Sequence, residues 1–343
     1  MAYLFVLAGL ALLIFGGEGL VRGSVSVARK LNISELVIGL TLVGCGTSMP
    51  ELVTSLKAID AGAVGISIGN VMGSNVANIL LVLGTAALIR PILTNPRALW
   101  RDALMLVLAT AALCALIWFD AFTRLTGFLL LAVLILYIAL SLLADQNADT
   151  PAAEMHVEEG GMVPSEFGIG VGLIIAIVGM VAIIFGANLL VQGAVTIART
   201  FGISEAVIGM SIVAIGTSLP ELATSVVAST RGKADVALGN VIGSNIFNIL
   251  GILGVTALVH PFSVIENQAG NLSGEAMQTG TATSIISTGD IGALVLSLFF
   301  LLLFGITGRK IARWEGALLL AGYALYMGLL FNLVPVPAIL PHG

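Results

Sequence analysis

Apolar stretches long enough to cross a bilayer, which takes about 20 residues in a helix, follow one another along most of this chain with short polar breaks between them. Of its 343 residues, 58% are hydrophobic and only 10% are charged, a balance outside the usual range of water-soluble domains. The stretches lack the alternation of barrel strands, so helices are the structure that lipid permits. We therefore expect an all-α, polytopic membrane protein.

Ten membrane-spanning helices fit these stretches. They are expected near residues 2–28, 33–59, 65–89, 100–119, 125–143, 168–198, 203–229, 236–259, 290–307 and 312–332. Lys and Arg accumulate in cytoplasmic loops, and an outside N-terminus places eleven basic residues on the inner connections and three on the outer ones. We therefore expect both termini outside. The short linker and compact loops favour a prokaryotic inner membrane.

Most of the acidic excess lies between the fifth and sixth expected helices. Residues 144–167 carry six acidic residues, and the net charge of the chain is −5. Five spans from an outside N-terminus place this segment on the inside. We therefore expect an acidic cytoplasmic linker between two five-helix units, residues 1–143 and residues 168–343. Nothing in the charge pattern indicates nucleic acid as a partner, and the expected surroundings are the lipid bilayer. The sequence indicates no oligomeric state.

The chain contains an internal repeat. Residues 14–84 align without a gap on residues 184–254, and 37 of the 71 positions are identical. Each half holds five expected helices, an odd number, so the second half enters the membrane upside down relative to the first. Such inverted repeats are typical of secondary transporters, with ion sites near the midplane where the repeats meet. Duplication for scaffolding alone does not explain why the most faithfully repeated residues are polar and lie at membrane depth.

Glu51 and its repeat counterpart Glu221 are the central candidates for an ion site. An ionised carboxylate at membrane depth costs several kcal/mol unless it is paired, and no Lys or Arg is placed to pair with either one. A bound cation is therefore the natural partner. Hydroxyl groups surround each glutamate at helical spacing: Thr47, Ser48 and Ser55 in the first half, and Thr217, Ser218 and Ser225 in the second.

Prolines and a further set of polar residues add oxygen atoms to this site. Pro50 and Pro220 cannot donate to the carbonyls of Gly46 and Gly216, so backbone oxygens are freed at the depth of the glutamates. The next helix of each half places three polar residues four positions apart on one face: Asn70, Ser74 and Asn78, with Asn240, Ser244 and Asn248 as counterparts. The alternative is that these groups, and Asn75 and Asn245, only join helices by hydrogen bonds. An all-oxygen environment suits hard cations such as calcium and sodium.

The paired segments GTSMPEL and GTSLPEL, with GNVMGSNVANIL and GNVIGSNIFNIL, resemble the two alpha-repeats of the sodium/calcium exchanger family, within the cation/calcium antiporter superfamily, in its prokaryotic form. The resemblance implies a ten-helix exchanger without a resident cofactor. It further implies that Glu51 and Glu221 bind calcium with Thr47 and Thr217. The implied sodium sites use Ser48, Ser74, Ser218 and Ser244 with backbone oxygens of Gly44 and Ala214, and Asn78 and Asn248 line the centre. Some family members carry Asp at the position of Asn248, so this chain lacks a possible third central carboxylate.

Two carboxylates, neutralised by one calcium or two sodium ions, couple the ions by competition. The expected function is therefore antiport of calcium against sodium by alternating access, with the first and sixth helices rocking across the others, and no enzymatic activity. A calcium/proton antiporter is the nearest alternative, because glutamates also carry protons. A calcium channel is a further alternative, although broken helices in inverted repeats favour a carrier.

Overall fold

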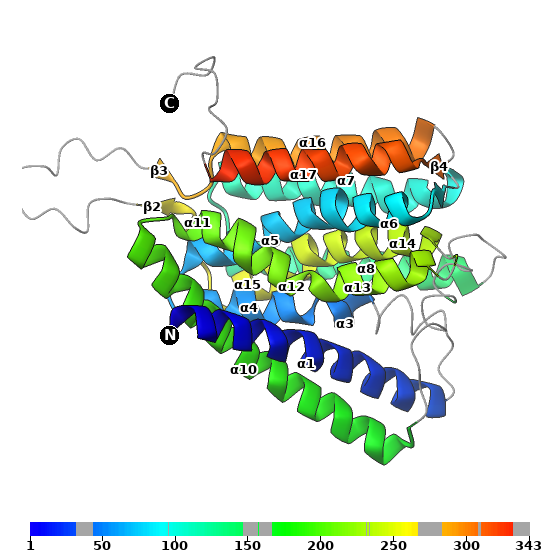
Figure 1. Ribbon diagram of the computed structural model, residues 1–343, viewed down its shortest axis with the longest axis horizontal. Coiled ribbons are helices and arrows are strands. Elements are labelled where there is room, and N and C mark those ends of the chain that lie inside the picture. The colour runs from blue at the N-terminus through cyan, green and yellow to red at the C-terminus, as the bar shows by residue number, and fades with distance from the viewer. Residues whose placement is uncertain are drawn as a thin grey trace, which may run out of the picture.

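The computed structural model describes residues 1–31, 44–94, 96–146, 157, 167–230, 232, 234–266, 283–307 and 310–331, and nearly all of them are helical (Figure 1). The α-helices of the first half are α1 (Ala2–Lys30), α3 (Gly44–Thr47), α4 (Met49–Asp60), α5 (Val64–Ala77), α6 (Gly84–Ile89), α7 (Pro96–Trp118) and α8 (Arg124–Gln146). Those of the second half are α10 (Ile169–Phe201), α11 (Glu205–Ile208), α12 (Ala214–Thr217), α13 (Leu219–Thr230), α14 (Ala234–Ile246), α15 (Leu253–Val259), α16 (Thr288–Thr307) and α17 (Arg313–Leu330). Three π-helical segments complete them: η2 (Asn78–Leu83), η3 (Gly209–Val213) and η4 (Phe247–Ile252).

Two short antiparallel strand pairs tie helix ends together. Strand β1 (Ile92–Leu93) pairs with β4 (Lys310–Ile311), and β2 (Ile265–Glu266) pairs with β3 (Thr283–Ser284). Each strand has only two residues, so the protein is all-α, as expected. Most of the expected linker 144–167 lies outside the described residues. The division into two five-helix units stays a prediction.

The long helices α1 and α10 form a slanted antiparallel pair beside the remaining helices (Figure 1). Glycines at the crossing bring the two backbones together. A Cβ atom added at Gly9 would lie 2.7 Å from the carbonyl oxygen of Gly186, and one added at Gly16 would lie 2.8 Å from that of Gly179. The repeat offset maps Gly9 onto Gly179 and Gly16 onto Gly186, so the two contacts are equivalent under exchange of the halves. This antiparallel, exchangeable packing is the relation expected for an inverted repeat.

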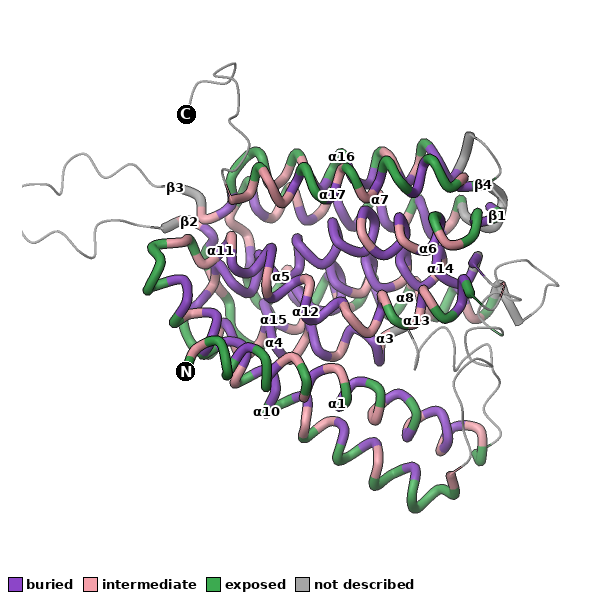
Figure 2. The backbone as a smooth tube through the Cα atoms, viewed as in Figure 1, coloured by how far each residue is buried: buried purple, intermediate pink, exposed green. Residues whose placement is uncertain are grey.

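The centre of the bundle is formed by the segments α5–η2–α6 and α14–η4–α15. Of the 18-residue apolar stretch in each of these spans, 78% is buried, whereas only 22% of the corresponding stretch in α8 is buried. Figure 2 shows the buried centre flanked by helices with exposed outer faces, among them α1, α10 and α16. Exposed Leu, Ile and Phe side chains on those outer helices match a lipid environment. Polar residues of the motifs therefore lie inside protein and away from lipid.

Seven described helices are long and apolar enough to span a membrane, and the count is eight if the bent pair of Glu205–Thr217 with Leu219–Thr230 is one span. The expected span 33–59 begins outside the described residues and continues as α3 and α4. The expected last span is α17, whose first turn carries Arg313 and Glu315. The polytopic membrane fold is thus confirmed, while the number ten stays a prediction.

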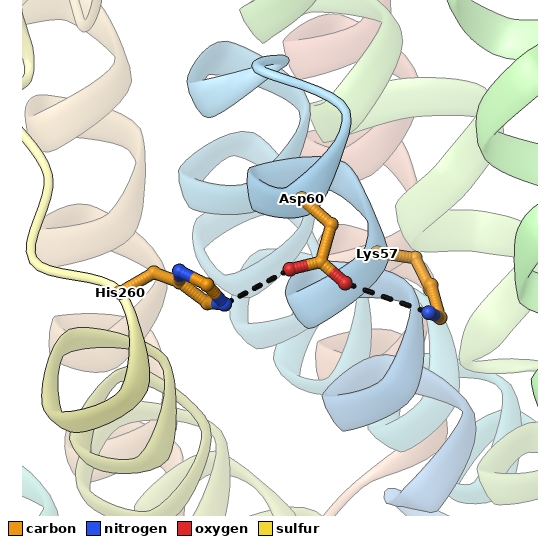
Figure 3. A network of polar contacts seen from close by, with 3 residues as sticks. All are labelled: Lys57, Asp60 and His260. Atoms are coloured by element: carbon orange, nitrogen blue, oxygen red, sulfur yellow. Dashed lines mark hydrogen bonds and ion pairs between the residues drawn. The ribbon is translucent and has the colours of Figure 1, made fainter.

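The ends of α4 and α15 lie on the same side of the bundle. Asp60 ends α4, and its carboxylate contacts the His260 Nε2, just after α15, at 3.0 Å and the Lys57 Nζ at 3.4 Å (Figure 3). The expected topology places both helix ends on the outer face, so this link agrees with it. Which face is the outer one stays a prediction.

Candidate ion site at two broken helices

Each half contains a helix that breaks at the motif serine. In the first half α3 ends at Thr47, Ser48 adopts φ −90° and ψ 9°, and α4 begins at Met49. In the second half Ser218 adopts φ −85° and ψ 7° between α12 and α13, and the segment Glu205–Thr217 is bent by 44° relative to Leu219–Thr230. The proline two residues after each serine cannot donate a helical hydrogen bond, which explains the position of both breaks.

The two breaks meet through a crossed pair of hydrogen bonds. The hydroxyl of Ser48 donates to the Oε1 of Glu221 at 2.9 Å, and the hydroxyl of Ser218 donates to the Oε1 of Glu51 at 3.1 Å. All four side chains are buried, and both glutamates are 0% exposed. Each half therefore supplies a serine to the glutamate of the other half. The two carboxylates expected from sequence to meet inside the membrane are indeed brought together.

Neither glutamate has a basic partner within the described residues. The second carboxylate oxygen of each, Oε2, is buried and has no hydrogen-bond partner in the described part of the chain. A buried carboxylate oxygen without a partner is costly. The site therefore offers two negative charges and two uncommitted oxygens to a cation.

Asn70 on α5 joins the two halves beside Glu51. Its Nδ2 donates to the backbone oxygen of Glu51 at 3.2 Å and to the hydroxyl of Ser55 at 3.0 Å, and its Oδ1 accepts from the hydroxyl of Thr217 at 3.0 Å. The counterpart Asn240 donates to the hydroxyl of Ser225 at 3.5 Å, and its Oδ1 has no partner among the described residues. Asn70 thus joins helices by hydrogen bonds, which is the alternative role considered for these polar residues in the sequence.

Further buried oxygens lie where α5 and α14 turn into π-helical segments. Asn78 is the first residue of η2, and Asn248 is the second of η4. The hydroxyls of Ser74 and Ser244, the Oδ1 of Asn78 and both ends of the Asn248 amide are buried and have no partner in the described chain. π-helical turns are frequent at functional sites, and no residue pattern in the motifs predicts these. Close packing of α5 on the other half accompanies them, since a Cβ atom added at Gly73 would lie 2.6 Å from the Cα of Met210.

The remaining expected ligands lie on the short helices before the breaks. Thr47 and Thr217 are the buried last residues of α3 and α12, and Gly44 and Ala214 are the first. The hydroxyl of Thr217 also lies 3.4 Å from the carbonyl oxygen of Ala214, which accepts from the backbone nitrogen of Ser218 at 3.1 Å. Because Thr217 donates its single hydroxyl hydrogen to Asn70, the carbonyl oxygen of Ala214 keeps a second lone pair with which it could bind an ion.

Helix α1 covers both breaks. A Cβ atom added at Gly17 would lie 3.5 Å from the Cγ of Pro50 and 3.9 Å from the Cγ of Pro220. Leu10 packs against Gly216, and Val21 packs against Gly46. A movement of α1 along its axis would therefore change the packing at both broken helices at once.

Other acidic groups at membrane depth have local partners. Glu18 on α1 forms an ion pair with Arg22 one turn later, and both side chains are about half exposed. The hydroxyl of Ser204 caps α11 by accepting from the backbone nitrogen of Val207, and Glu205 lies in the first turn. Neither Glu18 nor Glu205 therefore belongs to the pair of glutamates that meets at the breaks.

The site therefore collects carboxylate, hydroxyl and amide oxygens in a buried place, a donor set that hard cations prefer. A family model described as sodium/calcium exchanger protein matches residues 1–143 and 171–332. CaxA of Alkalimonas amylolytica is 37% identical over 332 residues, covering 97% of this chain and 99% of the relative. The sodium/calcium exchanger MaX1 of Methanosarcina acetivorans is 34% identical over 361 residues, covering 96% and 98%.

Solved structures agree with these relatives. The sodium-calcium exchanger NCX_Mj, soaked with 2.5 mM Na+ and 0.1 mM Ca2+, aligns with a TM-score of 0.61 over 95% of this chain and 97% of that one, at 34% identity. The matches extend over both repeats and include the two broken helices and the helices that follow them. The chain belongs to the sodium/calcium exchanger family.

Proposed function

We propose that this protein is a secondary antiporter that exchanges calcium for sodium across a prokaryotic inner membrane. The observation that carries the proposal is the crossed pair of Ser48 with Glu221 and Ser218 with Glu51, which brings two carboxylates without basic partners to one buried place. Two carboxylates carry a charge of −2, which one Ca2+ or two Na+ would neutralise. Ions that compete for the same pair cannot occupy it together, and this competition couples their movements.

Family membership suggests the ligand assignment, and the oxygens present support it. Calcium binds to Glu51 and Glu221 with the hydroxyls of Thr47 and Thr217. Sodium binds at flanking places formed by serine hydroxyls and backbone oxygens: Ser48, Ser74, Ser218, Ser244, Gly44 and Ala214. The amides of Asn78 and Asn248 line the centre. The unpartnered hydroxyls of Ser74 and Ser244 and the free Oδ1 of Asn78 support this assignment, because buried polar atoms are otherwise nearly always bonded.

We assign alternating access to a movement of α1 and α10. Glycines line the crossing of these two helices, and Gly17 on α1 faces Pro50 and Pro220 at the two breaks. Movement of this pair across the bundle opens the site first to one side of the membrane and then to the other. In the proposed orientation both termini lie outside. An ion is released only where the moving pair exposes the glutamates, as a carrier requires.

Purified protein in vesicles tests the proposal. Sodium-loaded vesicles diluted into sodium-free buffer should take up 45Ca2+, and an imposed pH gradient of equal size without sodium should not drive uptake. Uptake driven by the pH gradient alone would establish calcium/proton exchange instead. Calcium flux that persists at equal rate without any counter-ion gradient would indicate a channel.

A further inference from the structure

Four asparagines are buried on the paired central helices of the two halves, and hydrogen bonds link three of them across the halves. Asn75 and Asn78 come from α5 and η2, and Asn245 and Asn248 come from α14 and η4. All four are at most 1% exposed. An amide has one end that attracts cations and one that repels them, because its oxygen accepts while its NH2 group only donates. An asparagine therefore serves a cation only when something fixes its oxygen toward the ion.

A chain of hydrogen bonds fixes the direction of the Asn78 amide. The Nδ2 of Asn245 donates to the backbone oxygen of Asn75 at 3.2 Å. A backbone carbonyl can only accept, so the Oδ1 of Asn245 must lie on the opposite side of that amide. There it accepts from the Nδ2 of Asn78 at 3.0 Å. The Oδ1 of Asn78 is consequently the end left buried without a partner.

We propose that Asn245 is a positioning residue that holds the Asn78 amide with its oxygen toward the transported cation. The inference rests on the proposed function and deepens it, because it states what keeps a neutral ligand correctly oriented. Asn245 uses both ends of its own amide in this role, the NH2 group toward the backbone oxygen of Asn75 and the oxygen toward Asn78. Groups that support a ligand in this way typically contribute substantially to metal affinity.

The repeat places the equivalent pair of asparagines in the other half, where the corresponding hydrogen bond is not formed. The offset of 170 residues maps the bond from Asn78 to Asn245 onto one from Asn248 to Asn75. Asn75 donates to the backbone oxygen of Val71 at 2.7 Å, which leaves its Oδ1 available, and Asn248 has no described partner at either end. The Asn78 amide is thus oriented before an ion arrives, whereas the Asn248 amide is free to turn.

The test measures the calcium KM of sodium-driven uptake for Asn245→Ala in two backgrounds. In the wild-type background the KM should rise about 10-fold or more, the usual cost of losing a group that orients a metal ligand. In the Asn78→Asp background the same change should not raise the KM by more than about twofold, because both ends of a carboxylate are oxygens, which need no orientation and cannot donate to the Oδ1 of Asn245. A residue with a merely structural role would raise the KM equally in both backgrounds, which would overturn the proposal.

Controls separate this inference from the proposed function. Wild-type protein must first show sodium-driven uptake, since its failure refutes the proposed function alone. Asn188→Ala, at an exposed position on α10, is the matched substitution and should leave the KM unchanged. If Asn245→Ala does not fold, Asn245→Ser, whose side chain is too short to reach both partners, must give the same KM rise. Calcium-dependent thermal stabilisation in detergent provides a readout without transport, and unchanged calcium affinity in an active wild-type background refutes the role of Asn245.

Discussion

The two halves of the site have nearly the same sequence and yet differ in their hydrogen bonds. Asn70 of the first half makes three bonds, whereas Asn240 makes one long bond. Asn78 is held by a partner, whereas Asn248 is not. Inverted repeats that alternate between two sides exchange the arrangements of their halves. The asymmetry therefore describes one conformational state, and the symmetric part of the site marks what both states share.

The symmetric part consists of the two glutamates, and their neutralisation should have the largest effect. Glu51→Gln and Glu221→Gln should each reduce calcium uptake to below about 1% of wild type, because losing a ligand costs more than the 10- to 100-fold cost of losing its support. The two losses should be equal despite the asymmetry around them. Uptake of 45Ca2+ into sodium-loaded vesicles measures both.

Glu18→Gln is the matched control for the glutamates. It removes a carboxylate at membrane depth that already pairs with Arg22 on the same helix. We expect uptake close to that of wild type. Retention of a substantial rate in either central variant would show that transport does not require both carboxylates.

The crossed serines should rank second. Ser48→Ala and Ser218→Ala each remove one hydrogen bond to a carboxylate, which is worth about 1.5–3 kcal/mol, so the apparent affinity for calcium should fall by at least about tenfold. The falls should be similar, since the two bonds are 2.9 and 3.1 Å long. Ser211→Ala is the control, because this buried hydroxyl donates to the backbone oxygen of Val207 at 2.6 Å and not to a glutamate. If the calcium affinities of Ser48→Ala and Ser218→Ala differed by about tenfold, the asymmetry between the halves would extend to the hydrogen bonds of the two glutamates.

Asn70 and Asn240 probe the asymmetric part through stability. Asn70→Ala should lower the free energy of unfolding by about 2–4 kcal/mol, because it removes three buried hydrogen bonds at about 1 kcal/mol each and leaves partners unpaired. Asn240→Ala should cost less than about 1 kcal/mol by the same estimate. Thermal unfolding in detergent, without calcium or sodium, measures the difference. Equal losses would mean that the two amides are equivalent in solution.

Much of this fold could be predicted from sequence because lipid leaves few choices. Apolar stretches of spanning length give the helices, and the repeat gives the inverted relation that the crossing of α1 and α10 displays. The burial of Glu51 and Glu221 followed from the cost of a charge at membrane depth. The prolines indicated where the helices break, and the breaks occur at Ser48 and Ser218, two residues before them.

The remainder depends on tertiary packing. The segments 73–75 and 243–245 both read Gly-Ser-Asn, so no sequence pattern distinguishes Asn75, which bonds within its own helix, from Asn245, which bonds across the halves. The π-helical turns at η2 and η4 have no residue signature in the motifs. The role of Asn70 as a link between α4, α5 and α12 likewise required three helices to be placed.

The link between Asp60 and His260 should have the smallest effect, although it also joins the two halves (Figure 3). Its side chains are 42% and 50% exposed, so water and salt compete with this contact. It is an ion pair only when His260 is protonated, and exposed pairs contribute about 0–1 kcal/mol. Asp60→Asn should therefore shift thermal unfolding slightly, and the shift should vanish in 1 M salt, where the screening length is about 3 Å. Calcium KM should stay within about twofold of wild type, because hydrogen bonds to the buried glutamates hold the halves together at the site.

Lys57→Gln removes only the longer contact to the same carboxylate, at 3.4 Å, and should shift unfolding less than Asp60→Asn does. A large loss of transport in Asp60→Asn would mean that the contact between the halves at this end of the bundle, and not only at the buried serines, controls access to the site.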